Sequence, residues 1–196
     1  MRLSHTAVAL AVGALMSGTA LGQGTATAVQ RDVDQQQRIE QGLQSGQLTT
    51  REAAKLEKQE TKVEAVEKNA LKDGTLTPAE KARIANTQNA VSADIAAQKH
   101  DAQVGNPNSA SSKRMQADVQ RNVNQQARIE QGVQSGALTN KEVASLERGQ
   151  SHVTAKEARA GANGRVGAGE QVNVQTAENR QSAHIHAKKH NTVVAP

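Results

Sequence analysis

The chain has 196 residues and contains no Cys, Trp, Tyr or Phe, which excludes disulfides, thiol catalysis and thiolate metal sites. Aromatic side chains dominate most cores, so a core here must come from Leu, Ile, Val, Met and Ala. Only 36% of the residues are hydrophobic, and we therefore expect marginal stability, partial disorder or oligomerisation that completes the burial. The net charge of +5 is typical of a solvated surface rather than a nucleic-acid interface.

Residues 1–22 have the pattern of a cleavable signal peptide. Arg2 supplies a positive charge, a run of apolar and small residues follows, and small residues precede Gln23. The apolar run is shorter than the roughly 20 residues that a membrane-spanning helix needs. We therefore expect export to the periplasm or out of the cell, a mature chain that begins at Gln23 or else at Val29, and no stable membrane insertion after cleavage.

The remainder of the chain is a tandem duplication. A shift of ninety positions brings residues 29–101 onto residues 119–191 without a gap. The first copy carries 11 basic and 12 acidic residues, and the second carries 10 and 6, so the basic excess belongs to the second copy. The expected organisation is a signal peptide at 1–22, an N-terminal linker at 23–28, the first copy at 29–101, a flexible linker at 102–118, the second copy at 119–191 and a tail at 192–196.

Each copy contains the pattern of a helix end, a tight turn and a new helix start. The pattern is Ser-Gly-x-Leu-Thr-x-x-Glu or Asp-Gly-x-Leu-Thr-x-x-Glu. Glycine suits the left-handed position that closes a helix, and Thr followed three residues later by Glu forms a capping box. The structural capping residues predicted in this way are Thr49 with Glu52, Thr77 with Glu80, and Thr139 with Glu142.

The spacing of these signals predicts an all-α protein made of two tandem three-helix units of the helical-hairpin type. In the first copy Leu56, Val63 and Ala70 form a narrow apolar seam, which suits antiparallel or coiled-coil packing. Several glycines after residue 160 make the third helix of the second copy doubtful, so we expect that copy to be partly degenerate or disordered and the first to fold alone. The expected helices are 29–44, 50–72 and 78–100, then 119–134 and 140–160.

The motif R-I-x-Q-G-x-x-S-G-x-L-T-x-x-E, followed by D-G-x-L-T-P-x-E and ending in Q-K-H, resembles a group of small secreted helical proteins of proteobacteria of unknown function. The resemblance covers Val29–Asp101 and Val119–Leu146 well and the rest of the second copy loosely. It implies export and helical structure, and it carries no catalytic residues to transfer.

Two features could bind a divalent metal weakly. His186 and His190 are four residues apart, so that a helix would place them on one face, and His184 lies nearby. The turns at Gly46 and Gly74 also resemble the second half of an EF-hand loop, but they supply too few oxygen ligands for calcium. We therefore assign no metal site and no cofactor, and keep the histidine cluster and the degenerate loops as alternatives.

The acidic residues offer no catalytic constellation. Glu60 and Glu64 alternate with Lys58 and Lys62, a pattern typical of a solvent-exposed helix face. No nucleophile elbow and no phosphate-binding loop occurs, and without aromatic residues there is no platform for stacking bases. The sequence therefore predicts a protein that is not an enzyme and does not bind nucleic acid.

The favoured function is that of a non-enzymatic exported protein that acts by binding or shielding other macromolecules. Its partner would be a protein or another component of the cell envelope, and it could form a homo-oligomer. The alternatives are a hydrophilin-like stress protein, which stays largely disordered in buffer, and a weak binder of divalent metal.

Overall fold

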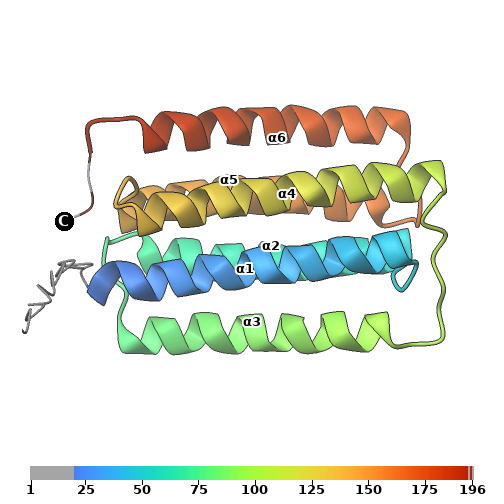
Figure 1. Cartoon of the computed structure of the whole chain (residues 1–196), viewed down its shortest axis with the longest axis horizontal. Helices are drawn as coiled ribbons and strands as arrows, with labels where there is room; N and C mark the ends of the chain where they lie inside the picture. The colour runs from blue at the N-terminus through green and yellow to red at the C-terminus, as the bar shows by residue number, and fades with distance from the viewer. Residues whose placement is uncertain (1–19, 194, 196) are drawn as a thin grey trace, which may run out of the picture.

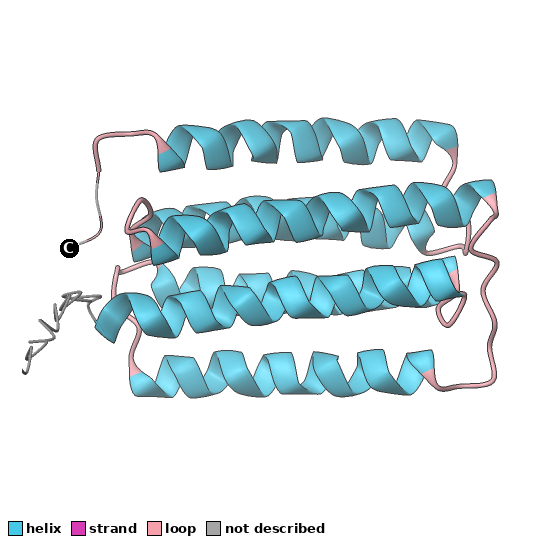
Figure 2. Ribbon diagram, viewed as in Figure 1, coloured by secondary structure: helices cyan, strands magenta, loops and turns pink. Residues whose placement is uncertain are grey.

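The computed structural model describes residues 20–193 and residue 195, and this part of the chain consists of six helices and their connections, with no strand (Figure 2). The prediction of an all-α protein is confirmed. All but the last three residues of the predicted signal peptide at 1–22 lie outside the described residues. In chain order the helices are α1 (Ala20–Ser45), α2 (Thr50–Leu71), α3 (Pro78–Lys99), α4 (Ala110–Gln134), α5 (Asn140–Gly161) and α6 (Ala168–Lys189).

The helices begin and end at the signals that the sequence contains. In each capping box the Thr side chain accepts a hydrogen bond from the backbone N–H of the Glu three residues on, and the Glu carboxylate accepts one from the Thr backbone N–H. The glycines that close the preceding turns have φ between 72° and 95°, a region that only glycine adopts easily. The boxes lie at Thr49–Glu52, Thr77–Glu80 and Thr139–Glu142, and the glycines are Gly46, Gly74 and Gly136.

Four helices form a central bundle, and the other two cover it from opposite sides. In Figure 1, α1, α2, α4 and α5 occupy the two middle layers, with α3 on one side and α6 on the other. Helix α3 packs on α1 and α2, and α6 packs on α4 and α5. Helices α1 and α4 run in opposite directions (Figure 1).

The two sequence copies are interlocked. The most extensive contacts of α2 are with α5, and those of α1 are with α4, so each central helix packs mainly on a helix of the other copy. Equivalent side-chain hydrogen bonds also recur in the two copies. Arg31 Nη2 donates to Asn89 Oδ1 at 2.6 Å, and ninety positions on Arg121 Nη2 donates to Asn179 Oδ1 at the same distance.

The expectation that the second copy is partly disordered is wrong. Its third helix, which the sequence left doubtful, is α6, a helix of 22 residues. The glycines near its start have structural uses. A Cβ atom on Gly161 would come within 2.7 Å of the Ala54 Cβ, so glycine allows α5 to approach α2 closely. Gly164 closes the turn with φ of 85°. The backbone N–H of Gly167 donates to Glu170 Oε2 at 2.8 Å, which keeps half of a capping box.

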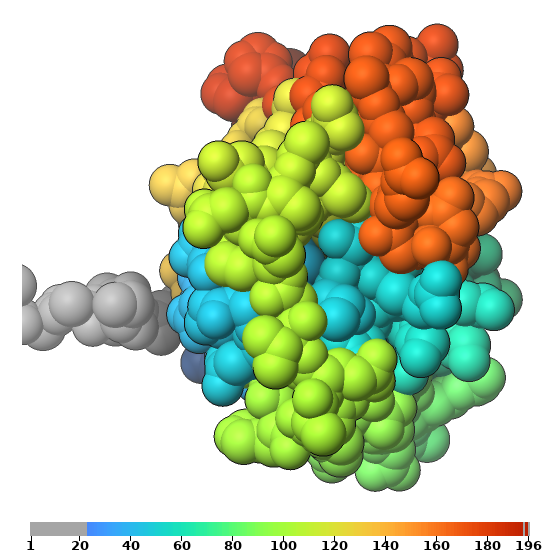
Figure 3. Space-filling view, turned by 90° about the vertical axis from the view of Figure 1, so that its right-hand side faces the viewer, coloured from blue at the N-terminus to red at the C-terminus, as the bar shows by residue number. Residues whose placement is uncertain are grey.

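The segments that were expected to be linkers are partly helical. Helix α4 begins at Ala110, so residues 110–118 are helix rather than flexible linker, and residues 23–28 lie within α1. The remaining connection crosses one end of the bundle from α3 to α4 (Figure 3). It is held there because Gly105 N donates to Gly46 O at 2.8 Å.

The apolar core is built without aromatic residues. The predicted seam of Leu56, Val63 and Ala70 is buried, and two apolar clusters each combine residues from both copies. No helix in residues 20–193 is long and apolar enough to cross a membrane. The apolar side chains do not fill the whole interior, however, and polar side chains occupy the rest.

Candidate metal centre

Carboxylates are buried throughout the bundle interior. Apart from the capping residues and Glu40, each buried acidic side chain is at most 2% exposed. Burying an ionised carboxylate is very unfavourable unless it is paired or bound to a cation. Among these groups in the described chain only Glu178 has an ion pair, with Arg121 at 3.1 Å. The buried set is Asp32, Glu57, Glu60, Glu64, Glu67, Asp118, Glu147, Glu157 and Glu178.

The expectation that Glu60 and Glu64 lie on an exposed face is wrong. Helix α2 is central, with α5 on one side and α3 and α1 on others, so that most of its circumference is covered. Residues three or four apart share a helix face, which places Glu60 on the side of both Leu56 and Val63. The lysines that alternate with these acids, Lys58 and Lys62, are exposed.

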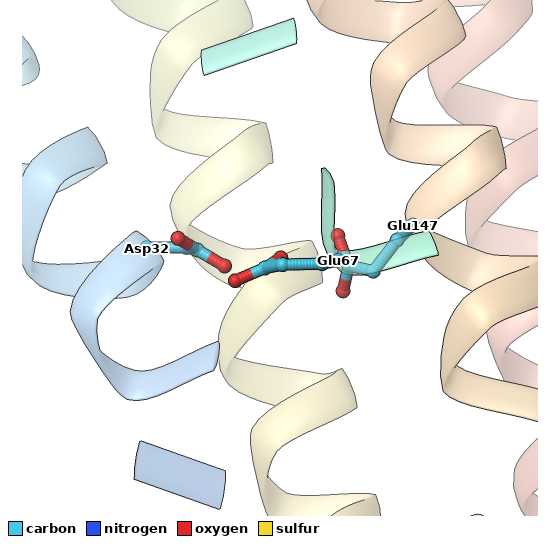
Figure 4. A group of neighbouring side chains, drawn as sticks. All are labelled: Asp32, Glu67 and Glu147. Atoms are coloured by element: carbon cyan, nitrogen blue, oxygen red, sulfur yellow. The ribbon is translucent and has the colours of Figure 1, made fainter. Parts of the chain in front are cut away.

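Three of these carboxylates converge on one point, and we call Asp32, Glu67 and Glu147 the Asp32 cluster. They come from α1, α2 and α5, and one oxygen of each lies within 4.8 Å of the others. Figure 4 shows the carboxylates of Asp32 and Glu67 facing each other, with Glu147 beside them. The cluster therefore joins two helices of the first copy to one of the second.

Amide side chains contact one oxygen of each carboxylate in the Asp32 cluster. Gln88 Nε2 lies 2.7 Å from Asp32 Oδ1 and 3.1 Å from Glu67 Oε1, and Gln126 Nε2 donates to Glu147 Oε2 at 3.2 Å. One buried oxygen of each carboxylate accepts no hydrogen bond from an amide or backbone group, and Asp32 and Glu67 share a hydrogen bond when one of them is protonated. Each acid is thus oriented by one oxygen, while the other is left available to a ligand.

A second group occupies the equivalent place ninety positions away, and we call Glu57, Asn122 and Glu157 the Glu157 cluster. Gln36 Nε2 donates to Glu57 Oε2 at 3.1 Å, and Asn122 Nδ2 donates to Glu157 Oε2 at 2.5 Å. Glu57 and Glu157 each keep a buried oxygen without a partner. The corresponding pairs are Glu147 with Glu57, Asp32 with Asn122, and Glu67 with Glu157.

An acid and an amide exchange places between the two clusters. The first has Asp32 and the amide Gln88, and the equivalent positions hold the amide Asn122 and the acid Glu178. Each copy therefore contributes one acid and one amide at this pair of positions. The number of acids at this pair of positions is therefore the same in both copies, although the residues differ.

The buried environment favours the protonated form of these acids. Burial raises the pKa of Asp32 to about 7, against the opposing effect of hydrogen bonds from its neighbours, and raises that of Glu147 to about 8. Burial also raises the pKa of Glu67 well above its usual range, and the charge of Asp32 raises it further. Even Glu178, beside Arg121, has its pKa raised to about 8 by burial. Near neutral pH the clusters therefore hold protons that a cation could displace.

The three histidines that were considered as metal ligands lie at the C-terminal end of α6. The rings of His186 and His190 stack with centroids 4.2 Å apart, and both residues are exposed. His184 is half-buried and lines a groove between α5 and α6, where burial lowers its pKa. In the described chain, no group of three metal-binding side chains includes any of the three.

In the turns that resemble EF-hand loops, the carboxylates accept hydrogen bonds from neighbouring residues of the same turn. Glu80 Oε2 accepts from the Thr77 backbone N–H at 2.9 Å and from its hydroxyl at 2.7 Å. Asp73 Oδ1 accepts from Thr75 N and Oγ1, both at 2.9 Å. These oxygens complete a helix cap and a turn.

Comparison with protein-family models, with curated proteins and with solved structures finds no match to this chain. The geometry of the interior is therefore the main basis for assigning a function.

Proposed function

We propose that this protein is a non-enzymatic binder of a hard divalent cation, which it holds in the interior of the bundle at the Asp32 cluster. The observation that carries the proposal is the convergence of three buried carboxylates from three helices, each with an oxygen that accepts no hydrogen bond from an amide or backbone group. Such oxygens are very unfavourable if left ionised and unpaired, and a cation would satisfy all three together.

The donor set indicates the class of cation. Carboxylate and amide oxygens suit Ca²⁺, Mg²⁺ and Mn²⁺, whereas soft metals prefer sulfur and imidazole. Three ionised carboxylates carry three negative charges, so one divalent cation and one retained proton leave the cluster nearly neutral. The Glu157 cluster, with its own pair of unpartnered oxygens, would be a second and weaker site.

The wider role proposed from the sequence remains an exported protein that binds or shields other macromolecules, built from two related three-helix units. Its partner would be a protein or other envelope component. Six packed helices support this role better than that of a hydrophilin-like stress protein, because such a protein is largely a coil in buffer. Circular dichroism of the mature chain separates the two, because the bundle predicts strong helicity and a cooperative melt.

The mature protein should begin at Gln23 rather than Val29. Thr25 and Ala28 are buried in the bundle, and Thr25 Oγ1 donates to Asn140 Oδ1 at 2.9 Å, so cleavage before Val29 would remove part of the folded structure. Mass spectrometry of protein from its native host measures the N-terminus directly. A dominant species that begins at Met1 would contradict export with cleavage.

Removing two of the three carboxylates should have opposite effects on the metal-free and cation-bound protein. The variant Glu67→Gln/Glu147→Gln should be more stable than wild type without metal at pH 8, because the neutral amides neither take up protons on folding nor bury a charge. It should also lose the stabilisation that a cation gives wild type, which is about 2.7 kcal/mol at ~100 times Kd. Thermal denaturation with and without CaCl₂, MnCl₂ or MgCl₂ measures both effects.

The matched control is Asp34→Asn/Asp94→Asn, which removes two exposed carboxylates from α1 and α3. It should keep the full response to the cation. An equal loss of response in both variants would show that the cation acts through general charge screening, and no response in wild type would overturn the proposal.

A further inference from the structure

A basic groove lies between α5 and α6, and no residue of the acidic clusters lines it. Its volume is about 810 Å³, and its lining includes Arg148, His152 and Lys156 from α5 and Arg180 and His184 from α6. The lining contains no acidic residue. Small polar side chains also line the groove, among them Ser145, Ser151, Asn173 and Thr176.

The basic and imidazole side chains form two stripes that face the groove. Arg148, His152 and Lys156 are four residues apart, so they follow one side of α5 over about 12 Å. Arg180 and His184 repeat this spacing on α6. No salt bridge or hydrogen bond within the described chain uses the side chains of Arg148, Lys156 or Arg180, so the fold does not need them for internal pairing.

The groove is more basic than the equivalent surface of the first copy. Ninety positions earlier, Arg148 and His152 correspond to Lys58 and Lys62. In contrast, Lys156, Arg180 and His184 correspond to Val66, Ala90 and Asp94. The first copy therefore keeps two basic residues on α2 but has none at the equivalent positions of α3. The basic excess of the second copy is thus concentrated where α5 and α6 form a hollow.

The floor of the groove also differs between the copies. Gly149 has no side chain, and a Cβ atom there would come within 1.9 Å of Gln181 Oε1. Gln181 lies across this glycine, and its Nε2 donates to Leu146 O at 2.9 Å. The first copy has Gln59 in place of Gly149.

We propose that this groove binds an extended ligand that carries several phosphate groups. Arginine guanidinium groups match phosphate in charge and in bidentate geometry, and the two stripes place cations along both sides of the hollow. The hydroxyl and amide groups between them supply further donors. The absence of aromatic residues in the chain disfavours a ligand that is held by stacked bases.

Calorimetric titration of the full mature chain with inorganic tripolyphosphate tests this site, in buffer free of divalent cations. We expect saturable binding that is weaker for monophosphate. The variant Arg148→Ala/Arg180→Ala should bind roughly tenfold or more weakly, the scale of one lost charge-assisted hydrogen bond. The control Lys58→Ala/Arg83→Ala removes two exposed cations from the first copy and should bind as wild type does.

Three outcomes would overturn the proposal. These are no binding of tripolyphosphate, equal weakening in both double variants, and tighter binding of a sulfated glycan than of tripolyphosphate. The acidic clusters are not part of the groove, so Glu67→Gln/Glu147→Gln should bind tripolyphosphate normally. The cation site and the phosphate groove are therefore tested independently of each other.

Discussion

The metal-free protein should lose stability as the pH rises from about 5 to about 8, opposite to the behaviour of proteins whose carboxylates are ion-paired. Burial raises the pKa of Asp32 to about 7 and of Glu147 to about 8, while the unfolded chain releases these protons near pH 4. The folded state therefore holds more protons in this range. Its stability is fully present at acid pH and is lost as the pH rises through the folded-state pKa values.

The effect should be large because several groups act together. Each extra proton held by the folded state changes the free energy of unfolding by about 1.4 kcal/mol per pH unit, and total stabilities are only about 5–15 kcal/mol. The pKa values of Asp73 and Glu142 are lowered instead, so their contribution is lost only at more acid pH. Urea denaturation of chelator-treated protein at pH 5, 6, 7 and 8 measures the trend. Stability that increases with pH would show that the buried acids are ionised without a cation.

Residues 23–101 on their own should not form a stable folded monomer, contrary to the expectation from the sequence that the first copy folds alone. In the full chain α1 packs on α4 and α2 on α5. Removing the second copy exposes apolar side chains such as Leu43, Leu56 and Val63. Each contributes about 1.5–3 kcal/mol when fully buried, so the loss is comparable with the whole stability of a domain.

A second molecule of the same fragment could replace the missing copy, because the two copies share their helices and most of their core positions. We therefore expect the fragment to be helical as a dimer at high concentration and to unfold on dilution. Sedimentation and circular dichroism over a range of concentrations measure this. A monomer that melts cooperatively at a temperature independent of concentration would contradict the interlocked packing.

The local structure could be predicted from the sequence, because its signals are local. Thr with Glu three residues later and a glycine before it marks a helix start and a helix end, and the structure places them at Thr77 and Gly74. The order of α6 could not be predicted in this way. Gly161 weakens an isolated helix, but its value depends on the close approach of Ala54 from the other copy, which is a tertiary contact.

The buried carboxylate clusters could not be predicted from the sequence, for a related reason. Glu next to Lys on a helix indicates solvent exposure only if one side of the helix is free, and α2 is nearly surrounded. A signal was nevertheless present in the repeat. Glu67 and Glu157 occupy equivalent positions, while Asp32 and Gln88 are exchanged for an amide and an acid. Without aromatic residues, the narrow apolar seams leave interior volume that carboxylates and amides fill.

The number of protons released when a cation binds tests the proposed site directly. Because the Asp32 cluster is protonated near neutral pH, a divalent cation must displace protons to bind there. Calorimetric titration of chelator-treated protein at pH 7, in two buffers of different ionisation enthalpy, gives this number for CaCl₂, MnCl₂ and MgCl₂. We expect at least one of these cations to bind with the release of about one proton or more, and Glu67→Gln/Glu147→Gln to abolish this release. No binding, or binding without proton release, would contradict the proposed site.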